Sequence, residues 1–225
     1  MKNTCFSLGL LLLSLVTTAQ KTTPQMVRQL IDQAVANKST VGLAAGVITA
    51  TGETWYHSAG FANRKSRKVF TPTTIARIAS ISKPITAVAI MQLVERGSIS
   101  LDTKVGTLIP AFAQGPKAEI TIQHLLQHSS GLPHYRDNKE VNNKKAYPSL
   151  TAVLALYQDR DLLFSPGTAF AYSVYGYVTL GIIIETVSGL SYADYLAKNI
   201  FAIAWMNHSS VEVFGQDYPG KAKLY

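Results

Sequence analysis

The sequence predicts a mixed helix-and-strand protein that opens with a helix and a β-hairpin and is mainly helical in its second half. Apolar residues recur at helical spacing over 25–37, and two strand-like runs follow, Val41 to Ala50 and Glu53 to His57, joined at Thr51-Gly52. After residue 80, apolar stretches of helical length alternate with turns rich in Gly, Pro and Ser.

Composition sets the broad class of the protein. A chain of 225 residues with 47% hydrophobic and 15% charged residues can bury a sizeable core, which excludes a disordered or collagen-like chain. The formal net charge is +8, but the basic residues are scattered and lack the interleaved aromatic residues of a nucleic-acid-binding surface. We therefore expect one domain or a little more, and no nucleic-acid partner.

The first residues have the pattern of an export signal. Lys2 supplies a positive start, Phe6 to Val16 is an apolar run, and Thr17-Thr18-Ala19 ends in small residues suited to cleavage. The run is about half the length of a membrane-spanning helix. We expect residues 1–19 to be a signal peptide and residues 20–225 to be a periplasmic or secreted chain that does not span the membrane.

The second half contains several stretches with a helical pattern. Ser82 to Arg96 is apolar almost all round, with Pro84 near its start and Gly97 after its end, so we expect a buried helix. Residues 129–148, rich in Ser, Gly, Pro, Asn and Lys, are expected to form a long irregular loop. Further helices are expected at 121–127, 149–158, 175–187 with Gly189 as terminator, and 191–204 with Ser191 as cap.

The only S-x-x-K in the chain is Ser80-Ile81-Ser82-Lys83. Chance alone gives about one such match in a chain of this composition, so its context matters more than its spacing. The match opens the apolar helix, which places Ser80 near the positive helix end and Lys83 on the same face. A lysine can activate a serine hydroxyl if desolvation or nearby positive charge lowers the lysine pKa. On this segment alone, a capping Ser80 with a solvated Lys83 is an equally good interpretation.

The surrounding motifs resemble those of class C serine β-lactamases and the related penicillin-binding proteins. Ile78 to Pro84 is similar to the first active-site motif of that family. The His134-Tyr135 pair and the run from Tyr172 to Tyr177 are most similar to the subgroup typified by the mitochondrial serine β-lactamase-like protein. Other matches follow in family order: Leu101 to Val105, Ile120 to Leu126, His128 to Pro133, Phe164 to Gly167, and Tyr172-Ser173.

The resemblance implies an α+β fold of the β-lactamase/transpeptidase type, in which an antiparallel sheet flanked by helices accompanies a mostly helical region. It also implies a serine hydrolase that works through an acyl-enzyme. In such an enzyme Ser80 attacks a carbonyl, Lys83 takes the serine proton with help from Tyr172, and water then releases the acid. We expect an amide or ester substrate that is peptide-like, such as cell-wall peptide or a β-lactam.

Tyr172 matches the tyrosine of the family's second motif, Y-x-N, although without the resemblance a core aromatic residue would be the simpler interpretation. Val174 stands where that motif has Asn, so an amide that would contact the substrate or the lysine is missing. This departure argues against β-lactam hydrolysis in particular. It also leaves open an alternative function, a non-catalytic protein that binds penicillin or peptide in the same pocket.

No metal or other cofactor is expected. His124 and His128 are four residues apart, but Leu125 stands where a zinc protease motif would have Glu, which favours packed or loop-bonding histidines. The only cysteine, Cys5, belongs to the predicted leader, so the mature chain has no thiol for a disulfide, a nucleophile or a zinc ligand.

The family's third motif, Lys or His followed by a small residue and Gly, has no counterpart in the chain, which contains neither K-[ST]-G nor H-x-G. By resemblance, the strand that carries this motif also supplies one donor of the oxyanion hole. We therefore expect the C-terminal strands of the sheet to be missing, leaving a two-stranded ribbon. The chain is expected to be the N-terminal part of a longer protein and to be inactive by itself.

Overall fold

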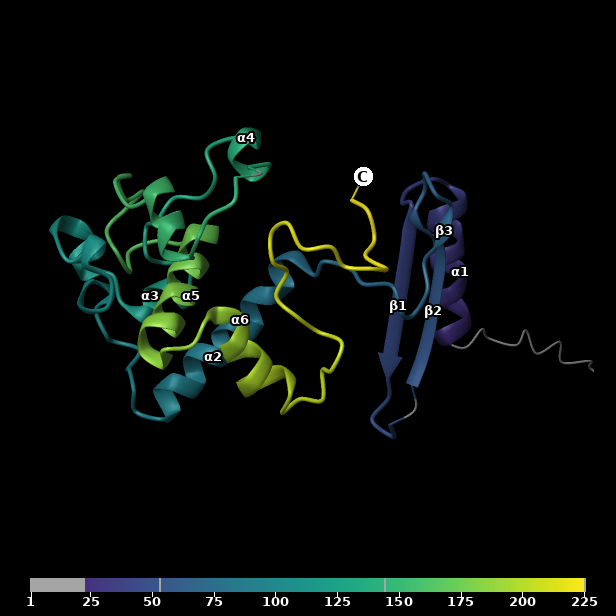
Figure 1. The fold of residues 1–225 in the computed structure, drawn as a ribbon, viewed down its shortest axis with the longest axis horizontal. Helices are drawn as coiled ribbons and strands as arrows, with labels where there is room; N and C mark the ends of the chain where they lie inside the picture. The colour runs from purple at the N-terminus through teal and green to yellow at the C-terminus, as the bar shows by residue number, and fades with distance from the viewer. Residues whose placement is uncertain (1–22, 53, 144, 225) are drawn as a thin grey trace, which may run out of the picture. The chain divides into compact units, whose positions relative to one another are not determined.

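The computed structural model describes residues 23–52, 54–143 and 145–224 (Figure 1). The predicted signal peptide, residues 1–19, and Cys5 within it lie outside the described residues. The chain divides into two compact units. The first comprises the residues up to Arg77 together with Tyr218–Tyr225, and the second is Ile78–Asp217.

The first unit is a small antiparallel sheet with one helix packed on it. Helix α1 (Thr23–Ala36) lies against strands β1 (Gly42–Ile48) and β2 (Thr54–Asn63). The two strands pair antiparallel, and a third strand, β3 (Lys68–Val69), pairs with the other edge of β2. Asp32 of α1 accepts a hydrogen bond from the imidazole of His57 on β2 at 2.9 Å if that ring carries its proton on Nε2, which ties the helix to the sheet.

The expected hairpin is confirmed, but its extent differs from the prediction. The second strand continues to Asn63, well past His57, and β3 was not expected, so the prediction of a two-stranded ribbon is wrong. The small residues Ser58, Ala59 and Gly60 follow His57 and remove the alternation of polar and apolar side chains that marks a strand in sequence. Pairing with β1 nonetheless continues through them as far as Gly60.

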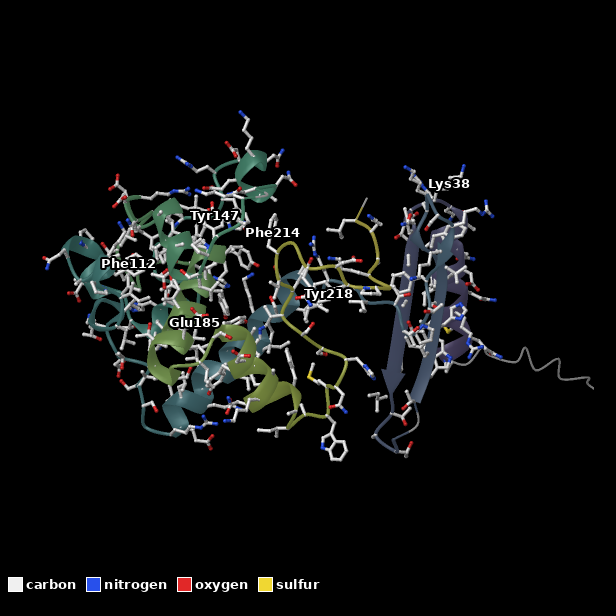
Figure 2. All side chains as sticks on the ribbon, in the orientation of Figure 1. Lys38, Phe112, Tyr147, Glu185, Phe214 and Tyr218 are labelled. Carbon is white, nitrogen blue, oxygen red and sulfur yellow. The ribbon has the colours of Figure 1, made fainter. Side chains whose placement is uncertain are left out.

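The second unit is helical and is built around helix α5. This helix contacts α2, α3 and α6, and its Leu180, Ile183 and Ile184 are fully buried. Phe112, labelled in Figure 2, belongs to the same core. The α-helices are α2 (Ser82–Glu95), α3 (Ile122–Leu126), α4 (Asn138–Val141), α5 (Val174–Ser188) and α6 (Tyr192–Leu196). Shorter 3-10 turns lie at Ala79–Ile81, Val105–Thr107, Pro110–Phe112, Gly115–Glu119 and Thr151–Leu156, and a π-helical turn at Ala197–Phe201.

The helix predictions for this unit are confirmed in part. Helix α5 ends at Gly189, whose φ is 70°, as expected, and the side chain of Ser191 caps α6 by accepting the Asp194 N–H. The stretch 191–204 is not one regular helix, because α6 passes into the π-helical turn. Residues 129–148 form an irregular loop interrupted by the single turn of α4.

The helix expected at 149–158 is confirmed only in part, because this stretch forms a 3-10 helix at Thr151–Leu156 rather than an α-helix. The chain leaves the helical conformation at Tyr157, whose φ is −143°. The Tyr157 side chain is fully buried, and its hydroxyl shares a 2.9 Å hydrogen bond with Thr179 of α5. Anchoring this aromatic residue in the core therefore takes precedence over continuing the helix.

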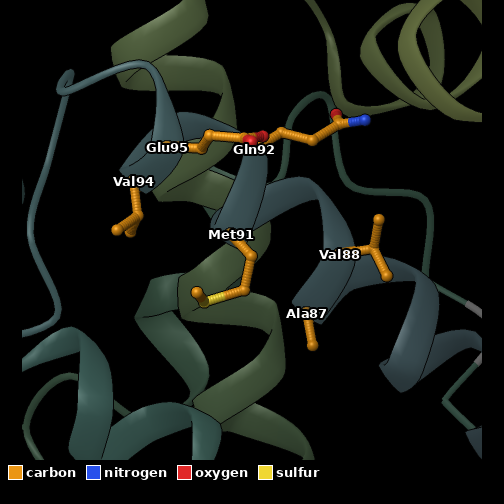
Figure 3. A pocket seen from close by; sticks show the side chains of 6 residues that line it. All are labelled: Ala87, Val88, Met91, Gln92, Val94 and Glu95. Carbon is orange, nitrogen blue, oxygen red and sulfur yellow. The ribbon is translucent and has the colours of Figure 1, made fainter.

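Helix α2 is not buried all round, contrary to the prediction. Ala89, Ile90 and Leu93 face the core, whereas Val88 is 50% and Met91 45% exposed. An apolar composition identifies a helix that can be buried, but it does not say which face meets another element. The exposed face borders an open hollow lined by Ala87, Val88, Met91, Gln92, Val94 and Glu95 (Figure 3).

Within the described part of the chain, no single helix combines the length and the apolar composition of a membrane span. Two helical segments reach that length and apolar composition only when they are taken together. They are Val174–Ser188 and Tyr192–Phe201, which meet at 80°.

Candidate active site

Ser80 lies in the 3-10 turn Ala79–Ile81, immediately before α2. The sequence predicted Ser80 in the first turn of the α-helix itself. In the structure it lies instead in the short 3-10 turn that precedes this helix. Ala79 has a φ of 45°, a left-handed conformation that costs a residue with a Cβ roughly 1–2 kcal/mol. The Ser82 hydroxyl donates to the Ala79 carbonyl at 2.7 Å and supports this turn. Backbone strain of this kind is concentrated at functional sites.

The structure brings the three predicted site residues together. The Ser80 and Tyr172 hydroxyls are 2.8 Å apart, although the residues are separated by 92 positions in the chain. The Lys83 ammonium donates to Ser80 Oγ at 3.3 Å. All three side chains belong to the second unit, and Ser80 is exposed, so an incoming molecule can reach its hydroxyl.

Lys83 lies among aromatic rings as well as beside Ser80. Its Nζ is 4.8 Å from the ring centre of Tyr172 and 5.6 Å from that of Tyr177, which are cation–π distances. Hydrogen bonding with Lys83, and secondarily with Ser80, lowers the pKa of the Tyr172 phenol from its usual value. The phenolate form of Tyr172 is therefore reached at a lower pH than in an isolated tyrosine.

Ser173 fixes the start of α5 directly after Tyr172. It is the N-cap residue, and its buried side chain accepts the Gly176 N–H at 3.1 Å while donating to the Pro133 carbonyl at 2.9 Å. Serine is favoured at this position because its oxygen satisfies a backbone donor that the helix leaves unpaired. Tyr172 therefore stands on a segment that is joined both to its own helix and to the loop before Tyr135.

The two loops of the site are joined through backbone hydrogen bonds. Gly131 has a φ of 78°, and a Cβ there would lie 2.3 Å from the Phe164 carbonyl oxygen, so only glycine fits. The Gly131 carbonyl accepts the Leu163 N–H, and the Ser129 carbonyl accepts the Gly167 N–H, both at 2.8 Å. The motifs His128 to Pro133 and Phe164 to Gly167, which stood out in the sequence, thus meet in space.

Two histidines that were not predicted as site residues contact the Tyr172 segment. Nδ1 of His128 accepts the Ser173 N–H at 3.2 Å, and Nδ1 of His134 accepts the Val174 N–H at 3.3 Å. Their ring centres lie 4.6 Å and 5.4 Å from that of Tyr172. The available signal in the sequence was that His128 follows helix α3 at the position where glycine usually ends a helix.

The metal alternative for His124 and His128 gains no support from their geometry. Nδ1 of His124 accepts the Thr121 N–H in a capping box at the start of α3, a role confined to its own helix. His128 is engaged with Ser173 instead. Among the described residues, no group of three or more His, Cys, Asp or Glu side chains is placed to hold a metal ion.

A nearly buried ion pair holds the loop that carries His134. The Glu140 side chain is only 8% and that of Arg160 15% exposed, and the two are directly hydrogen-bonded. The Arg136 N–H also donates to Glu140, at 2.6 Å. Hydrogen bonding from Arg160, above all, lowers the pKa of Glu140 to about 2. Glu140 therefore stays ionised and fastens α4 to the segment after Tyr157.

Comparisons with known proteins show which family the chain resembles. The family model described as "Beta-lactamase" matches residues 27–225. Penicillin-binding protein 4* of Bacillus subtilis is 36% identical over 70% of this chain and 35% of its own length. The human mitochondrial serine beta-lactamase-like protein LACTB is 29% identical over 70% of this chain and 41% of its own length. The chain therefore spans well under half the length of these curated relatives.

A solved structure with the same fold is that of a penicillin-binding protein from Bacillus halodurans. It is 30% identical, with a TM-score of 0.73, and the match covers 85% of this chain and 60% of that one. The resemblance drawn from the sequence and the α+β fold of the β-lactamase/transpeptidase type are both confirmed. With a family model that matches nearly all of it, the chain belongs to the beta-lactamase family.

Proposed function

We propose that the protein is a serine hydrolase in which Ser80 is the nucleophile and forms an acyl-enzyme. One observation carries the proposal: Ser80 Oγ lies within hydrogen-bonding distance of both Tyr172 Oη, at 2.8 Å, and Lys83 Nζ, at 3.3 Å. A serine needs such a proton acceptor before it can attack a carbonyl carbon. An isolated capping serine would not require two titratable partners.

The proposed reaction has two steps. In the first step, Ser80 Oγ bonds to the carbonyl carbon while its proton passes to Lys83 Nζ, acting as an uncharged amine, with the Tyr172 hydroxyl relaying it. The same proton is then delivered to the amine or alcohol as its bond to the carbonyl carbon breaks. The acyl group remains on Ser80 as an ester. Water, activated by the same groups, attacks this ester, releases the acid and restores the serine hydroxyl.

We propose a peptide-like amide or ester as the substrate. Two similar proteins carry the names penicillin-binding protein and serine beta-lactamase-like protein, both consistent with amide carbonyl chemistry. Val174 has no side-chain amide, so the site offers less polar contact to a bound β-lactam than the family motif Y-x-N would. This same feature favours one alternative, a protein that is acylated at Ser80 but releases the acyl group too slowly for turnover.

The test is active-site labelling of the intact protein with a fluorophosphonate or a fluorescent penicillin, followed over time. Wild type should be labelled, whereas Ser80→Ala should not. Ser82→Ala is the matched control, because Ser82 is two residues away and its hydroxyl bonds to the backbone of its own turn. Equal labelling of wild type and Ser80→Ala would refute the proposal. A penicillin label that decays indicates hydrolysis, and a lasting one supports the alternative.

A further inference from the structure

We infer that His128 is a positioning residue that holds Tyr172 in place by accepting the backbone N–H groups on both sides of it. The inference rests on the proposed function, because it assigns Tyr172 a part in the chemistry of Ser80. The His128 carbonyl accepts the Ala171 N–H at 2.9 Å, and its Nδ1 accepts the Ser173 N–H at 3.2 Å. One residue thus brackets Tyr172.

The backbone of His128 adopts an unfavourable conformation to make these contacts. Its φ is 58°, in the left-handed region, and it directly follows α3 and its C-cap Gln127. Glycine is the usual residue at this position because it has no Cβ to clash. A histidine at this position is less favourable than glycine for ending the helix. What the imidazole adds, and glycine cannot, is an acceptor for the Ser173 N–H.

Ring contacts reinforce the same position. The half-buried His128 imidazole has its ring centre 4.6 Å from that of Tyr172, 5.0 Å from that of Tyr177 and 6.0 Å from that of Phe170. On the other side of Ser173, His134 holds the Val174 N–H. The segment that carries Tyr172 is therefore fixed by hydrogen bonds at the amides of Ala171, Ser173 and Val174, while the Tyr172 hydroxyl contacts Ser80.

The bond to Ser173 requires a neutral imidazole. A backbone N–H can only donate, so Nδ1 must accept and the ring proton must reside on Nε2. The titratable and charged groups facing His128 are Lys83 on α2, His134 on the loop, Tyr172 just before α5 and Tyr177 in the first turn of α5. Burial first, then the charges of Lys83 and His134, lower the pKa of His128. The acceptor is thus available at neutral pH and is lost only in acid.

The experiment compares two substitutions of His128 in the intact protein, with acylation of Ser80 by a p-nitrophenyl ester or a fluorophosphonate as the readout. His128→Gly relieves the left-handed conformation but removes the acceptor. We expect acylation to slow by about 10²-fold, the effect of a misplaced catalytic group, with a thermal midpoint equal to or above that of wild type. A loss of activity without a loss of stability is what a purely structural role cannot produce.

His128→Asn is the rescuing variant. Asparagine tolerates the left-handed region, and its Oδ1 can occupy the place of Nδ1 as an acceptor. We expect a rate within about threefold of wild type. Because the pKa of His128 is lowered, wild type should show an additional loss of activity at a pH below the usual histidine value of about 6.5, when Nδ1 becomes a donor, and this additional loss should be absent in His128→Asn. His208→Asn, at an exposed turn in the same unit, should behave as wild type.

The outcomes separate this inference from the proposed function. If Ser80 is labelled in wild type but His128→Gly acylates at the wild-type rate, the inference is overturned and the proposed function stands. If Ser80 is never labelled, the proposed function fails first. In a Tyr172→Phe background, His128→Gly should cost little more, since both act through the same hydroxyl. A full 10²-fold additional loss in that background would also overturn the inference. Should His128→Gly fail to fold, the pH profile of His128→Asn still decides.

Discussion

Lys83 and Tyr172 reach the Ser80 hydroxyl by different routes. Lys83 follows three residues later and reaches it by a local contact, a relation that the spacing of the motif predicted. Tyr172 comes from 92 residues further along the chain, so only packing of the second unit can place it 2.8 Å from Ser80 Oγ. The two contacts therefore differ in how sensitive they are to the rest of the fold.

The role of Lys83 can be tested by a change that keeps its charge. In Lys83→Arg the guanidinium stays protonated, cannot take part in proton transfer, and has a geometry unlike that of an ammonium. We expect acylation of Ser80 to fall by about 10²- to 10⁴-fold, the usual contribution of a proton-transfer group. The rate is measured with a chromogenic ester.

A matched control for this change is Lys104→Arg. Lys104 is half-exposed and pairs with Glu119 at 2.6 Å, a contact that an arginine can also make. Its rate should equal that of wild type. Near-normal acylation in Lys83→Arg would make Lys83 a structural cation rather than a partner in proton transfer.

At the scale of elements, a nearly buried ion pair helps to fix the loop between α3 and the 3-10 turn Thr151–Leu156. Glu140 of α4 bonds to Arg160 and to the Arg136 N–H, with little access to water. In Glu140→Gln the guanidinium loses its charged partner. Removing one member of a buried pair costs about 3–5 kcal/mol, and since this pair keeps some contact with water, we expect about 2–3 kcal/mol from chemical denaturation.

The same pair predicts how stability depends on pH. The pKa of Glu140 is lowered to about 2 in the folded chain, from 4.5. Its contribution is therefore fully present above about pH 4.5 and is lost as the pH falls toward about 2. Glu140→Gln should flatten this part of the stability profile. Glu119→Gln, at an exposed pair, should change stability much less. An unchanged acid profile in Glu140→Gln would contradict the assignment.

At the scale of the whole molecule, the two units differ in the size of their cores. The buried cluster of apolar side chains belongs to the second unit, whereas the buried apolar residues described in the first are Ile31 and Ala62. Small sheets with little buried apolar surface have low local stability. We expect amides of α5 to exchange with deuterium at least about tenfold more slowly than those of β1, as measured by mass spectrometry. Equal protection of β1 would contradict this.

The sequence by itself determined the family, the α+β class, the opening helix and hairpin, and the residues Ser80, Lys83 and Tyr172 as candidates. Each depends on a local pattern, such as a spacing of three residues, a helical period or an ordered series of motifs. The sequence predicted the ends of helices and strands less well. Tyr157 ends its 3-10 helix because its side chain is buried in the core, and β2 continues through residues that have no strand pattern.

Only the tertiary structure decided how the site is assembled. His128 meets Ser173 across 45 positions, and Glu140 meets Arg160 across 20. Neither pairing leaves a periodic trace in the sequence, since the two partners of each hydrogen bond lie far apart in the chain and share no local repeat. The same holds for the left-handed conformation of Ala79 and His128, because the energy that offsets such strain comes from contacts made only when the chain is folded.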